Sequence, residues 1–453
     1  MDVVRIRHEG LGNTSYLVEV APGRALAVDP DRRVRLFLEA ADEHGWEIAD
    51  VVDTHVHADF VSGSLELARR TGARLHWPKD AGVAFDHDGV TAGERLEIGG
   101  VELEVRATPG HTPEHVSYVL RGDDGGAAPP ALFSGGALIA GGAARTDLIS
   151  PDLTDRLTHQ QFRTIHEAFA DLPDETLLMP THGSGSFCSV VSGGAGPTTL
   201  GAERGGNALI SMTDEDAFVS WWPSTFPAVP TYFGRMRDVN VAGPRPLDRI
   251  PPPPVLGPQA FAAARDAGAF VVDVRRPTTF CDGHVSGSLS IHFRDAFATW
   301  LGWLAPPDRD LLFVADGEPI DLVVEEALLV GYERFAGTLA GGIDAWRGAG
   351  LPIATTTVLG PDEAERALAA GALPLDVREP DELEEGRIAD AVNIPLGSLD
   401  ERIGELPDRR PVLTYCAAGE RSTTAASILE RHGIEPVANL AGGYGAWRRA
   451  GRD

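Results

Sequence analysis

The chain has 453 residues, a length typical of two to four domains. Apolar residues make up 43% and charged residues 23%, the balance of a folded protein, which excludes a largely disordered one. Acidic residues outnumber basic ones by 67 to 39, and the net charge of −28 argues against nucleic acid and anionic membranes as partners.

The first 245 residues alternate short strand-like runs with helical stretches, a pattern that predicts an α+β or an α/β sandwich. The predicted strands are 15–20, 25–28, 48–52, 101–107 and 116–120, and the predicted helices are 34–44, 63–71 and 155–169. A stretch rich in Gly and Ser, 183–201, predicts an extended loop. The chain shows no apolar run long enough for a membrane span and no apolar signal core near residue 1.

A proline-rich segment, 243–254, separates this region from a repeat. Val255-Leu-Gly-Pro258 recurs as Val358-Leu-Gly-Pro361, and Leu339-Ala-Gly-Gly342 recurs as Leu440-Ala-Gly-Gly443. These matches indicate two copies of one module of about 100 residues. Each copy alternates predicted strands (270–274 and 311–315; 373–377 and 412–415) with helices, which predicts a parallel sheet. We therefore expect three domains, 1–245, 246–354 and 355–453.

Histidines recur just after predicted strands in the first domain. His55, His57 and Asp59 follow the strand 48–52, His111 lies in a Pro-Gly-His-Thr-Pro turn, and His182 lies in Pro-Thr-His-Gly. Two imidazoles two positions apart, with a carboxylate close behind, can face one cation. The pattern predicts a metal centre.

With these motifs, residues 1–245 resemble the metallo-β-lactamase fold. Through the segments 109–113, 144–147, 182–186 and 230–236 they look most like its persulfide dioxygenase branch, in the form fused to rhodanese modules. The resemblance implies an αββα sandwich and one Fe(II) held by two histidines and an aspartate, with open positions for sulfur and O₂. It assigns His55 and His111 as ligands. His57, Asp59 and His182 are additional candidates, and Zn²⁺ is the alternative metal.

Two departures from the family pattern bear on this metal centre. Gly136 stands where the aspartate ligand is expected, so the iron triad is incomplete unless another group completes it. Phe60 stands where hydrolases of the glyoxalase II type carry a histidine, which argues against a two-zinc hydrolase. Cys188, six residues after His182, is a candidate relay thiol or ligand, with a plain loop cysteine as the alternative.

The second repeat carries Cys416 directly after the predicted strand 412–415 and before a predicted helix, 423–432. Backbone N–H groups at a helix N-terminus stabilise a negatively charged sulfur, and Arg421 and Ser422 add donors. The loop Cys416-x₄-Arg421 resembles that of rhodanese-homology sulfurtransferases, one residue shorter than the loop of cysteine phosphatases.

The first repeat lacks a cysteine at this position, near Ala315, so we expect a structural role for it. Cys281 is assigned to packing. The three cysteines are odd in number and far apart, which predicts free thiols and a cytoplasmic protein.

The leading hypothesis is a reactive-sulfur enzyme. Cys416 would move sulfane sulfur between thiosulfate, glutathione persulfide and small thiols, while the N-terminal domain would oxidise a persulfide with O₂. The first alternative is a sulfurtransferase whose N-terminal domain is metal-free, and the second is a zinc thioester hydrolase of glyoxalase II type. A homo-oligomer is left open.

Overall fold

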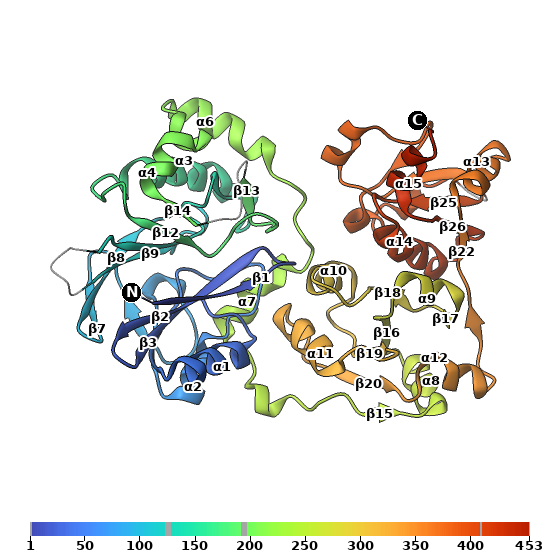
Figure 1. The fold of residues 1–453 in the computed structure, drawn as a ribbon, viewed down its shortest axis with the longest axis horizontal. Helices are drawn as coiled ribbons and strands as arrows, with labels where there is room; N and C mark the ends of the chain where they lie inside the picture. Colours follow the sequence, from blue (N-terminus) through green and yellow to red (C-terminus); the bar gives the residue numbers. More distant parts are fainter. Residues whose placement is uncertain (1, 123–127, 192–196, 408–409, 453) are drawn as a thin grey trace. The chain divides into compact units, whose positions relative to one another are not determined.

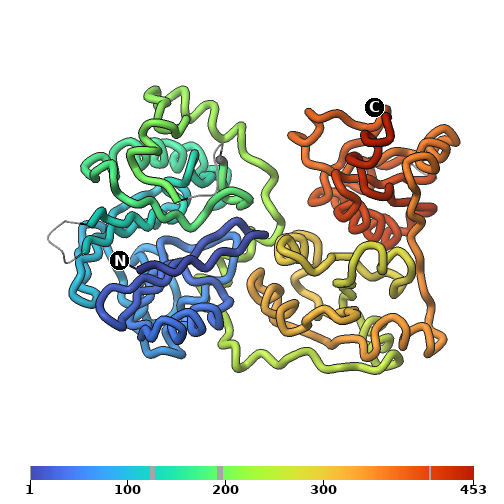
Figure 2. Tube along the Cα trace, in the orientation of Figure 1, coloured from blue at the N-terminus to red at the C-terminus, as the bar shows by residue number. Residues whose placement is uncertain are grey.

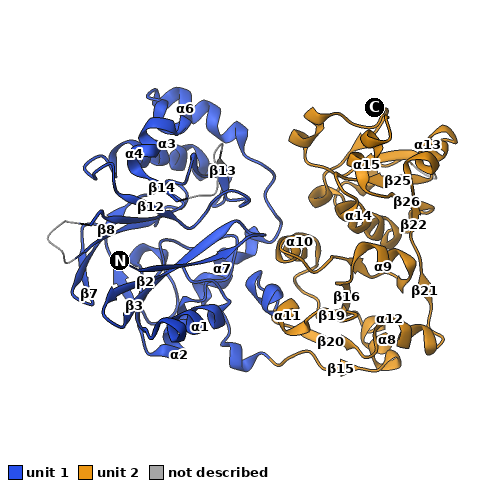
Figure 3. Ribbon diagram, viewed as in Figure 1, with its two compact units in different colours: residues 1–250, 325–332 blue, residues 251–324, 333–453 orange. Residues whose placement is uncertain are grey.

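The computed structural model describes residues 2–122, 128–191, 197–407 and 410–452 (Figures 1 and 2). It divides into two compact units, one of residues 1–250 with 325–332 and one of residues 251–324 with 333–453 (Figure 3). Within the described ranges, none of the helices has the length and apolar character that a bilayer crossing requires.

The first unit contains two six-stranded sheets. The first has the order β1 (Val3–His8), β2 (Asn13–Ala21), β3 (Arg24–Val28), β4 (Glu47–Val52), β5 (Arg74–Pro78), β6 (Asp88–Val90). The second has the order β14 (Thr198–Thr199), β12 (Leu177–Pro180), β10 (Ala131–Gly135), β9 (Val116–Arg121), β8 (Val101–Ala107), β7 (Arg95–Ile98). A separate antiparallel pair joins β11 (Gly142–Ala144) to β13 (Ser189–Val191).

Alternation along the strands explains the layers of this unit, because successive side chains of a strand point to opposite faces. Tyr16 and Val18 of β2 pack with residues of the second sheet such as Tyr118 and Phe133, which places one core between the sheets. Leu17, between them, packs instead with the helices on the outer face. A third core joins the outer face of the second sheet to α3. The expected αββα sandwich is confirmed.

Three helices of this unit, α1 to α3, lie close to the predicted ones, and α4 to α7 were not predicted. They are α1 (Val34–His44), α2 (Ser64–Thr71), α3 (Pro151–Glu167), α4 (Leu200–Gly206), α5 (Ala208–Ser211), α6 (Glu215–Trp221) and α7 (Phe233–Ala242). The helix predicted over 155–169 begins earlier because Pro151 occupies its first turn, where no backbone N–H is needed. The predicted loop 183–201 was partly wrong: it contains β13 and β14, and its residues 192–196 lie outside the described ranges.

The second unit contains two five-stranded parallel sheets, as predicted for the repeat. The first is ordered β15 (Val255–Leu256), β20 (Phe335–Leu339), β19 (Leu311–Val314), β16 (Phe270–Asp273), β18 (Leu289–Ser290). The second is ordered β22 (Thr357–Leu359), β26 (Val437–Leu440), β25 (Val412–Tyr415), β23 (Leu373–Asp376), β24 (Val392–Asn393). A short pair joins β17 (His284–Val285) to β21 (Ile353–Ala354).

The helices of the repeat are α8 (Pro258–Asp266), α9 (Pro277–Asp282), α10 (Phe297–Leu304), α11 (Ile320–Leu329), α12 (Gly342–Gly348), α13 (Pro361–Ala369), α14 (Glu420–Arg431) and α15 (Gly443–Arg449). Short 3₁₀ turns occur in both units. Those of the first unit are η1 (Lys79–Ala81), η2 (Trp222–Thr225) and η3 (Leu247–Arg249), and those of the second are η4 (Pro380–Glu385), η5 (Leu396–Ser398) and η6 (Ile403–Glu405). The helix predicted over 423–432 begins at Glu420, so Arg421 and Ser422 lie in its first turn.

Within the second unit, the first copy contacts helix α14 of the second. Ser290 donates its backbone N–H to Ser427 Oγ at 3.1 Å, and His284 Nε2 lies 3.1 Å from a carboxylate oxygen of Glu430. Thr356 Oγ1 donates to the other oxygen of Glu430 at 2.7 Å. The sheet of the second copy also packs on α14, so every residue of this helix from 422 to 429 is buried.

Candidate functional site

The motif histidines of the first unit all lie just past the ends of strands. His55 and His57 follow β4, His111 follows β8, and His182 follows β12. Each of the four is at most 1% exposed. The structure therefore gathers residues from four distant motifs, but it encloses them in the protein interior.

Three of the four imidazole rings lie close together. The ring centroids of His55, His111 and His182 are separated by 4.8, 5.2 and 5.2 Å, and the rings are inclined to one another by 63–74°. Nε2 of His55 lies 3.1 Å from Nε2 of His182. Nε2 of His111 is buried and has no hydrogen-bond partner within the described part of the chain.

Hydrogen bonds to the Nδ1 atoms determine where these rings carry their protons. Nδ1 of His111 donates to the backbone oxygen of Arg145 at 2.7 Å, and Nδ1 of His182 donates to Asn13 Oδ1 at 3.1 Å. Nδ1 of His55 lies 2.8 Å from Thr54 Oγ1, whose own proton is donated to a carboxylate. Each ring therefore carries its proton on Nδ1 and leaves a lone pair on Nε2.

Burial also keeps the rings of His55 and His111 neutral. It lowers the pKa of His55 well below the usual value and the pKa of His111 to about 3.

His57 has different neighbours. Its Nε2 lies 3.4 Å from Asp29 and 3.6 Å from Asp53. Burial alone would lower the pKa of His57, but these carboxylates outweigh it and raise the pKa to about 10, so the ring is an imidazolium. Its ring stacks on Phe60 at 4.2 Å. Asp29 and Asp53 were not predicted as site residues; their positions just past β3 and β4 were the available signal.

Metal-ligand atoms of the described residues come within 4.8 Å of one another in three groups: His55, His57 and His182; His111, His182 and Cys188; and Asp29, Asp53 and His57. His182 belongs to two of them, and no group contains both His55 and His111. Asp59 lies behind His182, with Oδ2 3.3 Å from Nδ1 of that ring, and accepts a hydrogen bond from Asn13 at 2.9 Å. Asp59 therefore holds the ring of His182.

His115 is a further residue that sequence reasoning missed. Its ring stacks on that of His55 at 4.7 Å, and its Nε2 accepts the backbone N–H of Gly136 at 3.0 Å. The signal was its position four residues after His111 in the same turn.

The space at Gly136 does not fit the expected iron ligand. A Cβ atom at this position would lie 2.8 Å from the Cβ of Ala144 and 2.8 Å from Cδ2 of His111, closer than real contacts allow. The backbone here has no side chain to offer, and its neighbours have closed around it. A facial triad of two histidines and the carboxylate at 136 is therefore not available in this chain.

Cys188 lies on the segment between His182 and β13 and is fully buried. Burial raises the pKa of its thiol well above the usual value. Its backbone oxygen accepts the N–H of Arg145 at 2.8 Å. Cys188 is thus a loop cysteine by sequence but lies next to the histidines in space.

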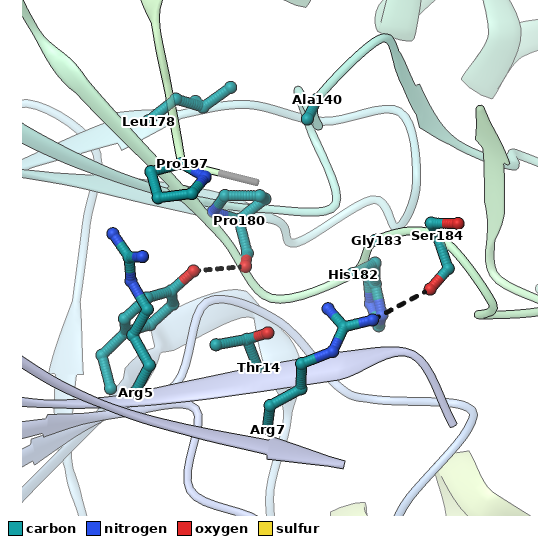
Figure 4. Close-up of a pocket in the computed structure, with 11 residues that line it drawn as sticks. Arg5, Arg7, Thr14, Ala140, Leu178, Pro180, His182, Gly183, Ser184 and Pro197 are labelled. Atoms are coloured by element: carbon teal, nitrogen blue, oxygen red, sulfur yellow. Dashed lines mark hydrogen bonds between the residues drawn. The ribbon is translucent and has the colours of Figure 1, made fainter. Parts of the chain in front are cut away.

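A hollow of about 100 Å³ is lined by His182 and the next two residues of its loop (Figure 4). Arg5 and Arg7 of β1 line it together with Pro180 and Ser184. Arg7 donates to the backbone oxygen of Ser184 at 3.3 Å and pairs with Glu9 at 2.8 Å. The side chain of His182 is itself fully buried, so this hollow does not open the histidine cluster to solvent.

In the second unit, Cys416 follows β25 and faces the N-terminus of α14. Its Sγ accepts the backbone N–H of Gly419 at 3.1 Å, and Ser422 Oγ lies 3.5 Å away. Gly419 has φ +100°, a conformation that favours glycine and that turns its N–H toward the sulfur. Ser422 also donates to Asn439 at 2.7 Å, which fixes its hydroxyl beside the thiol.

Arg421 is paired with a carboxylate of the same domain. Its two terminal nitrogens donate to the two oxygens of Glu382, in η4, at 2.6 Å each. Both terminal nitrogens of the Arg421 guanidinium are therefore bound to Glu382, although the sequence predicted them as donors at the rim of the Cys416 loop. Its positive charge still lies within electrostatic range of Cys416.

Residues 257–349 and 360–450 match the family model of the rhodanese-like domain. The two copies are rhodanese-like domains. The structure of a metallo-β-lactamase from Staphylococcus aureus subsp. aureus COL is 28% identical, has a TM-score of 0.66, and is matched over 75% of this chain and 98% of that one. The first unit accordingly has the metallo-β-lactamase fold, followed by two rhodanese-like domains.

Two further similarities concern the first unit. A hydroxyacylglutathione hydrolase from Polaromonas sp. is 36% identical over 174 residues, which are 38% of this chain and 62% of the relative. The chain thus spans less than two thirds of the length of this curated relative. The structure of ETHE1 from Myxococcus xanthus is 25% identical, has a TM-score of 0.41, and is matched over 55% of this chain and 96% of that one.

The first rhodanese-like domain has a different loop after the corresponding strand. Strand register places Val314 opposite Asp273 and Tyr415 opposite Asp376, so Ala315 corresponds to Cys416. In this loop the backbone N–H of Asp316 is bound by the carboxylate of Glu318 at 2.6 Å. An internal carboxylate therefore occupies a backbone donor of this loop, whereas a thiol does so in the second rhodanese-like domain. Cys281 of the first domain is buried in α9.

Proposed function

We propose that this protein is a sulfurtransferase that moves sulfane sulfur from thiosulfate or a persulfide to a small thiol at Cys416. The observation that carries the proposal is the hydrogen bond from Gly419 N–H to Cys416 Sγ, made at the N-terminus of α14. That position combines a backbone donor with the positive end of a helix dipole, and both stabilise a charged sulfur.

The reaction needs no external oxidant. The Cys416 thiolate attacks the outer sulfur of thiosulfate, the S–S bond breaks, and sulfite leaves with the bonding electron pair. A cysteine persulfide is formed, whose terminal sulfur carries the negative charge that the loop donors stabilise. A thiol such as glutathione then attacks that sulfur, forms a low-molecular-weight persulfide, and regenerates the thiolate of Cys416.

The test uses the full chain. After incubation with thiosulfate, the intact mass should rise by one sulfur atom, and added cyanide should yield thiocyanate. Cys416→Ser should reduce both to the uncatalysed background, because serine cannot hold the persulfide. Cys281→Ser, which changes a buried thiol outside the loop, should retain both. Thiocyanate formation by Cys416→Ser at the wild-type rate would refute the proposal.

Persulfide oxidation by the first unit is a second candidate. It is favoured by the close approach of His55 and His111, the residues that the resemblance assigns to Fe(II). The carboxylate of the triad has no counterpart at Gly136, so we derive no oxidation step. The deciding measurement is O₂ uptake by the iron-supplied chain with glutathione persulfide: uptake that His111→Ala removes supports oxidation, and its absence leaves sulfur transfer alone.

Thioester hydrolysis of the glyoxalase II type is a third candidate, and the curated relative from Polaromonas sp. is named a hydroxyacylglutathione hydrolase. Two residues of the first unit argue against thioester hydrolysis by this chain. Phe60 is buried against His57, and Gly136 offers no side chain, so two ligands of a second zinc are replaced. We expect the zinc-supplied chain not to cleave a glutathione thioester. Small thiols and persulfides are the proposed partners, and cytoplasmic location and oligomeric state stay predictions.

A further inference from the structure

We infer that Arg294 of the first rhodanese-like domain is a positioning residue for the Cys416 site of the second. Arg294 neutralises the carboxylate of Glu420, at the start of α14, and so allows a doubly charged sulfur donor such as thiosulfate to reach the sulfur of Cys416. The inference rests on the proposed sulfur transfer and gives a role in it to the domain that has no thiol in its own loop.

The segment that carries Arg294 lies along one face of α14. It follows β18, which packs beside this helix (Figure 1). Ser290, the last residue of β18, donates its backbone N–H to Ser427 Oγ at 3.1 Å, and Arg294 Nε lies 2.7 Å from Glu420 Oε2. Ser427 and Glu420 are about two helical turns apart and therefore share a face of the helix. The first domain thus contacts α14 as far as its N-terminus, where the Cys416 loop ends.

Glu420 carries a negative charge at a helix end that serves to stabilise a charged sulfur. It is the first residue of α14 and directly follows Gly419, whose N–H binds Cys416 Sγ at 3.1 Å. A carboxylate in the first turn offsets the positive potential of the helix N-terminus, and it repels an anion that approaches. Arg421 does not cancel this charge, because both of its terminal nitrogens bind Glu382 at 2.6 Å.

Arg294 supplies the countercharge that Glu420 needs. His292 lies on the same side, with Nδ1 4.0 Å from the other oxygen of Glu420, and this nitrogen is buried without a hydrogen-bond partner among the described residues. Burial lowers the pKa of His292, so its ring is neutral near pH 7. The positive charge that meets Glu420 is therefore that of Arg294.

The pair of Arg294 with Glu420 has solvent access. The two side chains are 38% and 42% exposed, and an ion pair with this exposure adds little to stability. Its main effect is on the charge beside the loop, which matters most for a donor that is itself charged. Thiosulfate carries two negative charges at neutral pH, so an unpaired Glu420 would repel it twice as strongly as a monoanion.

The experiment measures kcat/KM of the full chain for thiosulfate and for cyanide. The thiol takes up sulfur from the first and passes it to the second in alternate half-reactions, so the two values report uptake and release separately. Arg294→Gln should lower kcat/KM for thiosulfate about fivefold. The value for cyanide, which is mostly uncharged HCN at neutral pH, should stay unchanged. Arg294→Lys keeps the charge and should retain both values.

A second substitution separates the effect of charge from an effect on structure. Glu420→Gln, made in the Arg294→Gln background, should restore kcat/KM for thiosulfate, because no carboxylate is left to neutralise. The loss in Arg294→Gln should also shrink in about 1 M NaCl, where the screening length is about 3 Å. Arg334→Gln is the matched control: its pair with Asp310, at 3.1 Å, lies at the opposite ends of the strands of the first domain. It should leave kcat/KM for thiosulfate unchanged.

Two results would overturn the inference. One is a kcat/KM for thiosulfate in Arg294→Gln that equals that of the wild type. The other is a loss that persists when Glu420→Gln is added, because a structural defect would not be repaired by removing a charge. A wild-type chain that forms no thiocyanate refutes sulfur transfer at Cys416 itself, so the two proposals fail by different observations.

Discussion

The two rhodanese-like domains share a scaffold and differ in one loop. Both sheets have the same strand order, and both carry a buried ion pair at the end of a central strand, Asp273 with Arg275 and Asp376 with Arg378, each at 2.6 Å. Only the second domain has a thiol in the loop after the neighbouring central strand, which is β25 there and β19 in the first domain. The comparison teaches that the elements which hold the fold are separate from the few residues that supply chemistry.

The largest loss of stability is expected from breaking the ion pairs that the two domains share. Asp376→Asn leaves Arg378 buried without its countercharge, and Asp273→Asn does the same to Arg275. Each change should lower the free energy of unfolding by about 3–5 kcal/mol. Urea unfolding of the full chain measures both. A large loss in one variant and none in the other would show that the two scaffolds are not equivalent.

A smaller loss of stability is expected from breaking the ion pair of Arg421 with Glu382, which lies beside the Cys416 loop of the second domain. Burial alone would raise the pKa of Glu382, but the hydrogen bonds from Arg421 lower it below the usual value. The pair therefore contributes fully above the unfolded pKa of about 4.3, and its contribution is lost as the pH falls through the lower folded pKa.

Glu382→Gln should cost less than about 1 kcal/mol at neutral pH and nothing in acid, where the wild type loses the pair as well. Unfolding free energies at several pH values measure this. Glu385→Gln, whose partner Arg448 is 3.9 Å away on the surface, is the control and should change little at any pH. If Glu382→Gln lowered the free energy of unfolding by the same amount at all pH values, the lost stability could not be assigned to the ion pair with Arg421.

The smallest effect, on sulfur transfer, is expected from placing a thiol in the loop of the first domain without any other change. Ala315→Cys, made in the Cys416→Ser background, should produce no thiocyanate above that background. The carboxylate of Glu318 already binds the backbone N–H of Asp316. Measurable transfer by this double variant would show that the thiol suffices on either scaffold.

Much of this fold could be predicted because it depends on local patterns. The strands 101–107 and 412–415 match β8 and β25, since the first alternates apolar and charged residues and the second is a short, mostly apolar run. The repeat was visible in its glycine pairs. Helix α14 was placed three residues late, because its first turn consists of polar residues that also suit a loop.

The candidate sites were predictable only as collections of residues. Histidines after strands were expected to gather, and they do. Which nitrogen of His55 meets His182 depends on the packing of segments 127 residues apart, and no local pattern encodes it. The pairing of Arg421 with Glu382 and the closure of Ala144 over Gly136 likewise arise only in the folded chain. The roles of these residues stay predictions.

Helix α14 is buried on all sides from residue 422 to residue 429, between its own sheet and the first rhodanese-like domain. The helix therefore has little freedom to shift when charge develops on the sulfur at its N-terminus. Donors that are already in position need no reorganisation energy to receive a charge. On this view the first rhodanese-like domain, which has no thiol in its loop, contributes to sulfur transfer without touching sulfur, by keeping the electrostatic environment of Cys416 rigid.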